Sequence, residues 1–444
     1  MTRPSGTHSA RVPSGARPAE EIRARWSWVE SEAWTDRMLT TLEDGVKGGR
    51  WYSLIDKVAS PRLLEAAFAR SRRNRGAAGV DHVTIDRFGS RLENEVEALS
   101  RSLREGTYRP QRVLRRWIPK LGGGQRPLGI PTVRDRVAQG ALRSVLEPIF
   151  ERDFAQHSYG FRPGRSCRDA LRRVQSLLDR GHCWVVDADI RSFFDTIDHE
   201  RLLDEVSKKI ADGRILDLLR AFLRQGVIEG LEGWTPVQGT PQGAVISPLL
   251  ANIYLNPLDH ELAWRGFEVV RYADDLVILC RSEAQARAAH RQLKVWVDRV
   301  GLSLHDEKTR VVDVRQDFFD FLGYRFERGQ RWPRPKSLNR LKTRVRELTR
   351  GNNGHSLERI ITRLNAVLRG WFGYFKHSHR YIFERLDRWI RVRLRGILRR
   401  RVGLRGCSRG RGNDNVRWPN AFFASHGLFS LQRAHAEACQ SSRR

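Results

Sequence analysis

Two apolar runs, residues 267–270 and 276–280, flank the five residues Arg271-Tyr272-Ala273-Asp274-Asp275. Apolar runs rich in Val, Leu and Ile on both sides of a short polar stretch are typical of a β-hairpin, here with two adjacent carboxylates at its tip. Crowded carboxylates repel each other and tend to take up a proton, and a bound divalent cation such as Mg²⁺ removes that penalty. A solvated hairpin with an acidic turn is the better interpretation of an isolated Asp-Asp pair. The choice between such a turn and a cation site therefore depends on the rest of the chain.

The chain is strongly basic. Its 444 residues contain 81 Lys and Arg against 51 Asp and Glu, a net charge of +30. A chain this basic repels itself unless it meets a polyanion, so nucleic acid is the leading partner. A membrane surface is the alternative, but no apolar stretch approaches the length that crosses a bilayer.

The excess charge is concentrated near the C-terminal end. Residues 331–413 contain 24 Lys and Arg against 4 Asp and Glu, a net +20. This concentration indicates a surface that follows phosphates, with binding that weakens steeply as salt rises. Arg outnumbers Lys, which suits bidentate phosphate contacts, although a GC-rich genome would produce the same preference without any function.

The cysteines and the N-terminal segment set further limits. None of the five cysteines forms a Cys-x-x-Cys pair, which argues against a structural zinc site or a disulfide framework and fits a reducing compartment. Residues 1–24 are rich in Pro, Gly, Ser and Arg, so we expect a flexible segment. Their composition could also mimic a transit peptide, but no secretory leader is visible.

Periodicity and punctuation predict the order of the elements. Pro61 follows a capping Ser60 and predicts a helix start, and Asp187 and Asp189 fall on one face of a predicted strand. Helices are expected over 25–58, 61–72, 85–103, 135–150, 201–229, 246–258 and 283–300, and again beyond Pro333. Strands are expected over 115–120 and 122–131 around a glycine loop, over 184–190, and as a strand-and-turn unit over 318–326.

Three loops are candidates for ligand contact. Lys120 and Arg126 flank the glycine loop and could close on a triphosphate, although the spacing is not that of a phosphate-loop nucleotidase. Gln242 lies at the tip of the tight loop 239–243, where it could hydrogen-bond a ligand. The glycines of residues 74–81 allow a sharp loop. For the second and third of these loops, a plain turn or connector remains the alternative.

Taken together, these pieces resemble the group II intron-encoded reverse transcriptases, or maturases, over roughly residues 50–400. The resemblance rests on blocks that follow one another in the family's order: WIPKLGGGQRPLGIPTVRDRVAQ, SYGFRPGRSCRDAL, DADIRSFFDTIDH, GTPQGAVISPLLANIYL, RYADDLVILC, LSLHDEKT, FDFLGYRF and LNAVLRGWFGYF. One such block is a weak signal, but the ordered series is a strong one.

The resemblance implies an α+β fold: a right-hand polymerase whose fingers and palm contain an antiparallel sheet, followed by an α-helical thumb. It divides the chain into a partly disordered N-terminal extension (1–50), fingers with an extra N-terminal block (51–182), a palm (183–328), a helical thumb or maturase domain (329–402) and a short basic, DNA-binding-like tail (403–444).

The resemblance also implies the site residues. Two Mg²⁺ ions would be held by Asp189, Asp274, Asp275 and the backbone of Ile190, with the three aspartates as catalytic residues. Asp187 is expected outside this set, and Asp195 is expected to start a helix. The nucleotide would contact Lys120, Arg126, Phe194, Gln242 and Lys308. RNA would contact Asn74, Gly79, Arg369, Trp371 and Lys376.

The expected function is RNA-directed DNA synthesis together with binding of a group II intron RNA, assistance in its splicing, and reverse transcription for retrohoming. The partners implied are the intron RNA, an RNA template, a DNA primer or target DNA, and dNTPs, with no membrane and a bacterial cytoplasmic or nucleoid location. An intron-free reverse transcriptase in repair or phage defence, and a splicing factor without polymerase activity, are the alternatives.

Two departures from the family pattern bear on these expectations. Ala244 stands where a second glycine is common, which puts the local loop geometry in question. No Cys/His cluster follows the thumb block, so we expect no zinc-supported nicking endonuclease and a primer made elsewhere. A supercoiled-plasmid nicking assay would contradict this expectation if it showed second-strand cutting.

Overall fold

The computed structural model describes residues 19–46, 48–119, 124–230, 232–351, 354–403 and 411–441. The chain divides into two compact units. The first comprises the described residues of Met1–Arg173, Ala188–Leu276 and Ala288–Thr309, and the second those of Val174–Asp187, Val277–Arg287 and Arg310–Arg444. None of the helices in the described ranges combines the length and the apolar character needed to cross a membrane.

A cluster of helices forms the N-terminal part of the first unit. Its members are α1 (Ala19–Arg25), α2 (Asp36–Asp44), α3 (Ile55–Val58), α4 (Pro61–Arg73), α5 (Ile85–Gly89), α6 (Leu92–Glu105) and α7 (Val133–Glu151). The predicted start of α4 is confirmed, since Ser60 is its N-cap and Pro61 its first residue. Helix α7 is buried along most of its length, and a Cβ added at Gly140 would lie 3.2 Å from Cβ of Ala67 on α4. This close approach is how the two helices pack.

Three sequence predictions in this region need correction. Residues 19–24, expected to be flexible, form α1. The helix expected over 25–58 is replaced by α2 and α3 with turns between them, and the helix expected over 85–103 breaks between α5 and α6. The break falls at Ser90 and Arg91, directly after Gly89, whose entropy loss on ordering disfavours a continuous helix.

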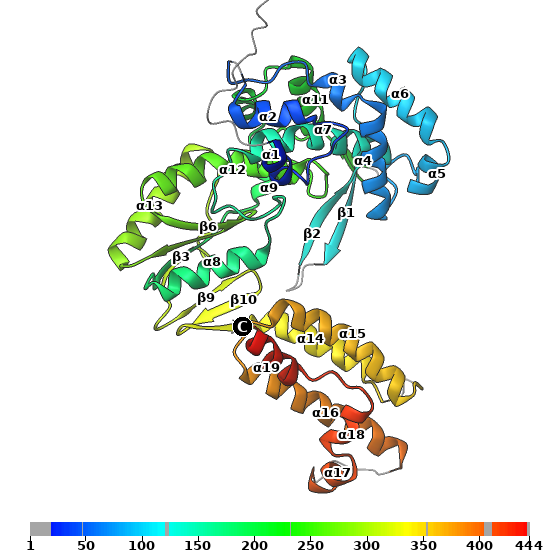
Figure 1. Ribbon diagram of the computed structural model, residues 1–444, viewed down its shortest axis with the longest axis vertical. Coiled ribbons are helices and arrows are strands. Elements are labelled where there is room, and N and C mark those ends of the chain that lie inside the picture. Colours follow the sequence, from blue (N-terminus) through cyan, green and yellow to red (C-terminus); the bar gives the residue numbers. More distant parts are fainter. Residues whose placement is uncertain are drawn as a thin grey trace, which may run out of the picture. The chain divides into compact units, whose positions relative to one another are not determined.

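A four-stranded sheet of the first unit has the order β2-β1-β4-β5. Strands β1 (Val113–Pro119) and β2 (Gln125–Ile130) form the predicted antiparallel hairpin, drawn in Figure 1. β4 (Val227–Glu229) runs parallel to β1, and β5 (Glu232–Trp234) is antiparallel to β4. The helix predicted over 201–229 is therefore wrong at its end: the chain forms α10 (His199–Ser207), α11 (Gly213–Leu223) and then β4.

A second sheet carries the candidate site at the ends of its strands. Its order is β6-β7-β3-β8, and β3 pairs antiparallel with β8. The strands are β3 (Trp184–Asp189), β6 (Glu268–Tyr272), β7 (Asp275–Cys280) and β8 (Arg310–Asp313). The helices of this part of the chain are α8 (Cys167–Asp179), α9 (Phe193–Thr196), α12 (Ser247–Trp264) and α13 (Glu283–Arg299).

The second unit continues into a helical C-terminal region. A small sheet, β11-β10-β9, is built from β9 (Phe318–Phe321), β10 (Tyr324–Glu327) and β11 (Gln330–Pro333). The helices that follow are α14 (Pro335–Leu348), α15 (Leu357–Phe375), α16 (Tyr381–Arg401), α17 (Arg411–Arg417), α18 (Asn420–Ser425) and α19 (Leu431–Ser441), with α14 beside α15 in Figure 1.

One hydrophobic core unites these helices. It includes Leu364 and Leu368 of α15, Phe383 of α16, and Phe423 and Leu431 from the C-terminal segment, all of which are fully buried. The apolar residues after Trp418 therefore pack against the helices that precede them.

Candidate active site

The site is built on the turn between β6 and β7, where Ala273 and Asp274 connect the two strands. Ala273 has φ +59°, a left-handed conformation that costs a residue with a Cβ on the order of 1 kcal/mol. The loop around Gly160 packs against this turn, and a Cβ added at Gly160 would lie 2.2 Å from the nitrogen of Ala273. The turn therefore depends on contacts from outside the hairpin.

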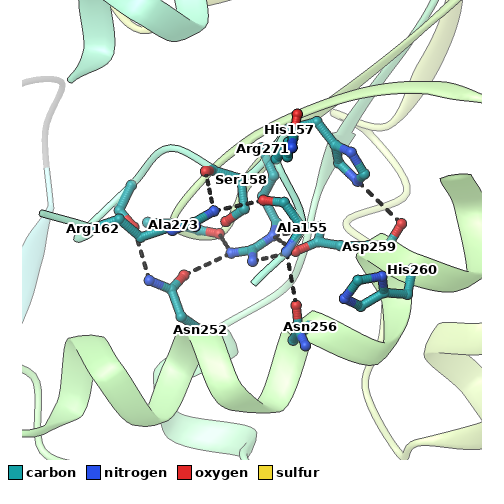
Figure 2. Close-up of polar contacts among 12 residues, drawn as sticks. Ala155, His157, Ser158, Arg162, Asn252, Asn256, Asp259, His260, Arg271 and Ala273 are labelled. Atoms are coloured by element: carbon teal, nitrogen blue, oxygen red, sulfur yellow. Dashed lines mark hydrogen bonds and ion pairs between the residues drawn. The ribbon is translucent and has the colours of Figure 1, made fainter. Parts of the chain in front are cut away.

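Arg271, 1% exposed, is the centre of those contacts (Figure 2). Its Nε donates to both carboxylate oxygens of Asp259 on α12, at 2.8 and 3.0 Å. Its Nη1 donates to Oδ1 of Asn252 at 3.0 Å and to the carbonyl oxygen of Ala273 at 2.8 Å. The guanidinium thus connects the turn to α12 through hydrogen bonds in a water-poor interior, where such bonds are strong.

The loop 157–160 supplies the second support. The backbone N–H of Arg271 donates to the carbonyl of His157 at 3.0 Å, and the N–H of Tyr159 donates to the carbonyl of Arg271 at 2.8 Å. Asn252 donates to the carbonyl of Gly160 at 2.9 Å, which connects this loop to the same helix. The block beginning at Ser158 therefore extends the sheet edge through its parallel bridge to Arg271 of β6.

Asp189 ends β3 and is positioned by the segment 303–309. Its carbonyl accepts the N–H of His305 at 2.8 Å, and its carboxylate accepts Nζ of Lys308 at 2.6 Å. The Lys308 ammonium thus places a positive charge beside Asp189, the carboxylate that the sequence predicts to be a metal ligand. Asp187, predicted outside the site, forms an ion pair with Arg310 at 3.9 Å.

The fold brings Asp189 close enough to Asp274 for its charge to affect the pKa of the Asp274 carboxyl. Burial raises the pKa of the Asp274 carboxyl, and the neighbouring charge of Asp189 raises it further, against the lowering effects of its own backbone N–H and of Arg271. Two carboxylates that disfavour each other's charge favour a bound cation. Asp275, the first residue of β7, is exposed beside them.

These residues fit a magnesium site. Within the described ranges, no group of three or more His, Cys, Asp or Glu side chains could hold a metal ion. Mg²⁺ needs no such group, because it is usually held by one or two carboxylates together with substrate phosphates and water. The oxygen-only donor set of Asp189 and Asp274 therefore suits a hard divalent cation.

The backbone of Ile190 is compatible with the predicted metal contact. Ile190 forms an antiparallel bridge with Leu304, and the flanking hydrogen bonds use the carbonyl of Asp189 and the N–H of Arg191. In such a pair the carbonyl of the central residue points away from its partner strand. The Ile190 carbonyl is therefore directed away from Leu304.

The predicted nucleotide contacts lie on several elements of the first unit. Arg126 is exposed on β2, and Phe194 on α9 is half-buried against Phe193. Gln242 lies in the loop before α12, where its carbonyl accepts the N–H of Gly129 at 2.7 Å. Lys308 pairs with Asp189, as described above. Lys120 lies outside the described residues, and the roles of all five stay predictions.

The predicted RNA contacts are dispersed. Asn74 is the exposed C-cap of α4, whereas Gly79 is buried, and its Cβ would lie 2.7 Å from Cα of Thr132. Arg369 is exposed on α15 with its guanidinium 4.8 Å from the Phe429 ring centre. Trp371 stacks on Phe375 at 4.8 Å, and the half-buried Lys376 is the C-cap of α15. Gly79 thus has a packing role that the sequence did not show, and the RNA contacts stay predictions.

Sequence reasoning missed the residues that support the turn: Arg271 as a buried ion-pair partner, Asp259, Asn252, His157 and Gly160. The available signal was weak. A lone Asp259 in an apolar helix and a basic residue directly before the acidic turn are compatible with a buried pair, but 12 positions separate them and no local periodicity relates them.

Two family models match the chain. Residues 118–326 match the model described as reverse transcriptase (RNA-dependent DNA polymerase). Residues 338–411 match the group II intron, maturase-specific domain. These matches define the class of protein as an RNA-directed DNA polymerase.

The chain is also similar in sequence to two bacterial proteins. Protein YkfC of Escherichia coli (strain K12) is 35% identical over 316 residues, which cover 62% of this chain and 83% of that protein. The group II intron-encoded protein LtrA of Lactococcus lactis subsp. cremoris is 36% identical over 255 residues, covering 57% of this chain and 41% of that protein. The chain thus spans less than half the length of LtrA.

A telomerase structure from Candida albicans is similar over 79% of this chain and 69% of that chain, with 14% identity and a TM-score of 0.41. The chain belongs to the group II intron-encoded reverse transcriptases with a maturase domain. The predicted family and the mixed α+β fold with a helical C-terminal region are confirmed.

Proposed function

We propose that this chain extends a DNA primer on an RNA template from dNTPs at the site around Asp189 and Asp274, and that it also binds a group II intron RNA, assists its splicing and supports retrohoming. The observation that carries the proposal is the convergence of these two carboxylates from β3 and the β6–β7 turn, 85 positions apart in sequence, onto one electrostatic site.

Asp189 and Asp274 would hold two Mg²⁺ ions, with Asp275 and the Ile190 carbonyl beside them. Ions bound there would supply the charge that activates a primer 3′-hydroxyl and stabilises the departing pyrophosphate. The chain's own contribution is positioning: Arg271 holds the turn that carries Asp274, and the 303–309 segment holds Asp189. Arg126 would bind the triphosphate, Phe194 would exclude a ribose 2′-hydroxyl, and Gln242 would contact the nucleotide or template.

The helical region of the second unit would bind RNA. Residues 331–413 carry a net charge of +20, and Arg369 is exposed on α15 within the block that matches the maturase-specific domain. Structured RNA is recognised mainly through its shape and its phosphates, which suits an arginine-rich helical surface.

A non-enzymatic splicing factor is not favoured, because the reverse transcriptase match spans both carboxylate blocks. A cytoplasmic location stays a prediction.

Primer extension tests the polymerase proposal. The purified full chain is incubated with Mg²⁺, dNTPs and a DNA primer annealed to an RNA template, with EDTA as the metal-free control. We expect extension in Mg²⁺ and none in EDTA. No extension in Mg²⁺ with a correctly folded protein would overturn the polymerase proposal. A splicing reaction with the intron RNA at near-physiological salt tests the maturase proposal separately. The same splicing rate with and without the protein would contradict that proposal.

A further inference from the structure

Two tryptophans and an arginine lie near one another on one face of the sheet β2-β1-β4-β5. Arg115 and Trp117 are two residues apart on β1, so their side chains point to the same face. Val113, also on that face, is in register with Val227 of β4, which pairs with Trp234 of β5. Trp234 therefore reaches the same face from the edge strand of the sheet.

The three side chains form an aromatic–cation–aromatic arrangement. The guanidinium carbon of Arg115 lies 4.7 Å from the ring centre of Trp234 and 5.8 Å from that of Trp117. Nε1 of Trp117 donates to the carboxylate of Glu229, so the polar edge of this indole is satisfied within the protein. The two indoles are nevertheless 45% and 37% exposed. Large aromatic groups that stay exposed beside one another are typical of a binding surface.

The arrangement borders a pocket with a volume of about 620 Å³. In the β1–β2 ladder, Gly129 stands opposite Arg115 and Pro127 opposite Trp117, so the neighbouring strand adds little side-chain volume on this face. A Cβ at Gly129 would lie 3.2 Å from Cβ of Pro241, which shows how closely the loop before α12 approaches the sheet. The pocket is also lined by Ser192, Asp195 and residues 235–242.

We propose that this pocket is a stacking site for an unpaired base of the template strand, held against Trp117 and Trp234 with Arg115 contacting the adjacent phosphate. Bases of any identity stack on aromatic rings and on guanidinium planes, which gives affinity without sequence preference. A positively charged Arg in the same pocket suits the sugar–phosphate backbone. The inference rests on the proposed polymerase function.

The lining residues favour the template strand over the incoming nucleotide. They include Gln242 and Ser192, the latter three residues beyond Asp189, so the pocket adjoins the candidate active site. Among the described residues that line it, however, are neither the two carboxylates nor Arg126. A triphosphate bound for reaction needs those groups, whereas an unpaired base next to the site does not.

Binding of two primer–template duplexes by the full chain tests the inference. One duplex carries a single-stranded 5′ extension of the RNA template, and the other is blunt. We expect Trp234→Ala to weaken binding of the extended duplex about tenfold and to leave binding of the blunt duplex unchanged. Trp234→Phe keeps a ring at this position and should retain most of the affinity. Trp264→Ala, which removes an indole that is 83% exposed outside the pocket, is the matched control and should change neither affinity.

A second variant guards against a folding defect in the first. Arg115→Lys keeps the charge but loses the planar group, so it should weaken binding of the extended duplex while preserving the salt dependence. Equal affinity of the wild-type chain, Trp234→Ala and Arg115→Lys for the extended duplex would overturn the stacking site. So would a raised KM for dNTPs with unchanged binding of the extended duplex, since the pocket would then belong to the nucleotide. Failure of the proposed function would appear differently, as a wild-type chain that does not extend a primer.

Discussion

The protonation state of the His157 imidazole affects the stability of the candidate site. Burial lowers the pKa of its imidazole, nearby Arg271 and His260 lower it further, and Asp259 opposes them. Its Nε2 contacts the Asp259 carbonyl at 3.1 Å, which the neutral ring satisfies as a donor. Because the unfolded chain binds this proton more readily, the contribution to stability is complete above an unfolded pKa near 6.5 and is lost as pH falls below it.

His157→Gln tests this linkage, since the glutamine amide can donate a similar hydrogen bond without titrating. We expect the thermal midpoint of the wild-type chain to fall between pH 7.5 and pH 5.5 by more than that of the variant. Midpoints measured at both pH values provide the comparison. The same fall in both proteins would show that another group controls the acid sensitivity.

Among single substitutions, we expect those in the buried pair of Arg271 and Asp259 to reduce the free energy of unfolding most. Asp259→Asn leaves the guanidinium without its counter-charge in a site where both side chains are about 1% exposed or less. The expected decrease in unfolding free energy is about 3 kcal/mol, measured by denaturant titration. Arg433→Ala, which removes a highly exposed partner of Glu437, is the control and should cost about 0.5 kcal/mol. Equal effects would contradict the role assigned to the buried pair.

At the scale of elements, the loop around Gly160 and the β6–β7 turn act as one support for Asp274. Gly160→Ala places a Cβ against the backbone of Ala273, so the turn must move. We expect a loss of kcat of at least about tenfold and a stability loss of about 1–3 kcal/mol. Gly213→Ala at the start of α11 meets nothing within 4 Å and should be neutral in both assays. Full activity in the Gly160 variant would mean that the turn tolerates displacement.

Elements with local signals were predictable from the sequence. The β1–β2 hairpin, the Pro61 start of α4 and the helices after Pro333 follow from periodicity, glycine and proline placement. Residues 227–229 did not follow, because their strand conformation comes from pairing with β1 more than 110 positions earlier. Tertiary pairing of this kind overrides local helical propensity.

The same difference between local sequence signals and tertiary contacts applies to the candidate site. Asp189 and Asp274 were identifiable from the blocks that contain them, yet their separation in space is a property of the fold. The pairing of Arg271 with Asp259 and the contact of Lys308 with Asp189 depend on which elements pack together. No pattern along the chain encodes those contacts, so only the structure reveals them.

At the scale of the whole molecule, charge is the property that most constrains the partner. A net charge of +30, with +20 of it in residues 331–413, predicts RNA binding that releases many counterions. We expect the affinity of the full chain for a structured RNA to fall by at least about a hundredfold between 50 and 200 mM salt. Filter binding at several salt concentrations measures the slope. A flat dependence would contradict phosphate tracking by this segment.

The most direct test of the central claim is primer extension by Asp274→Asn, measured together with RNA binding by the same preparation. Loss of a carboxylate proposed to bind a metal ion should slow nucleotide incorporation by about a thousandfold or more, equivalent to about 4 kcal/mol of transition-state stabilisation. RNA affinity should stay within about twofold of wild type, because the basic helical region is unchanged. Incorporation at the wild-type rate by the variant would contradict the assignment of Asp274, and with it the cation site that Asp274 is proposed to share with Asp189.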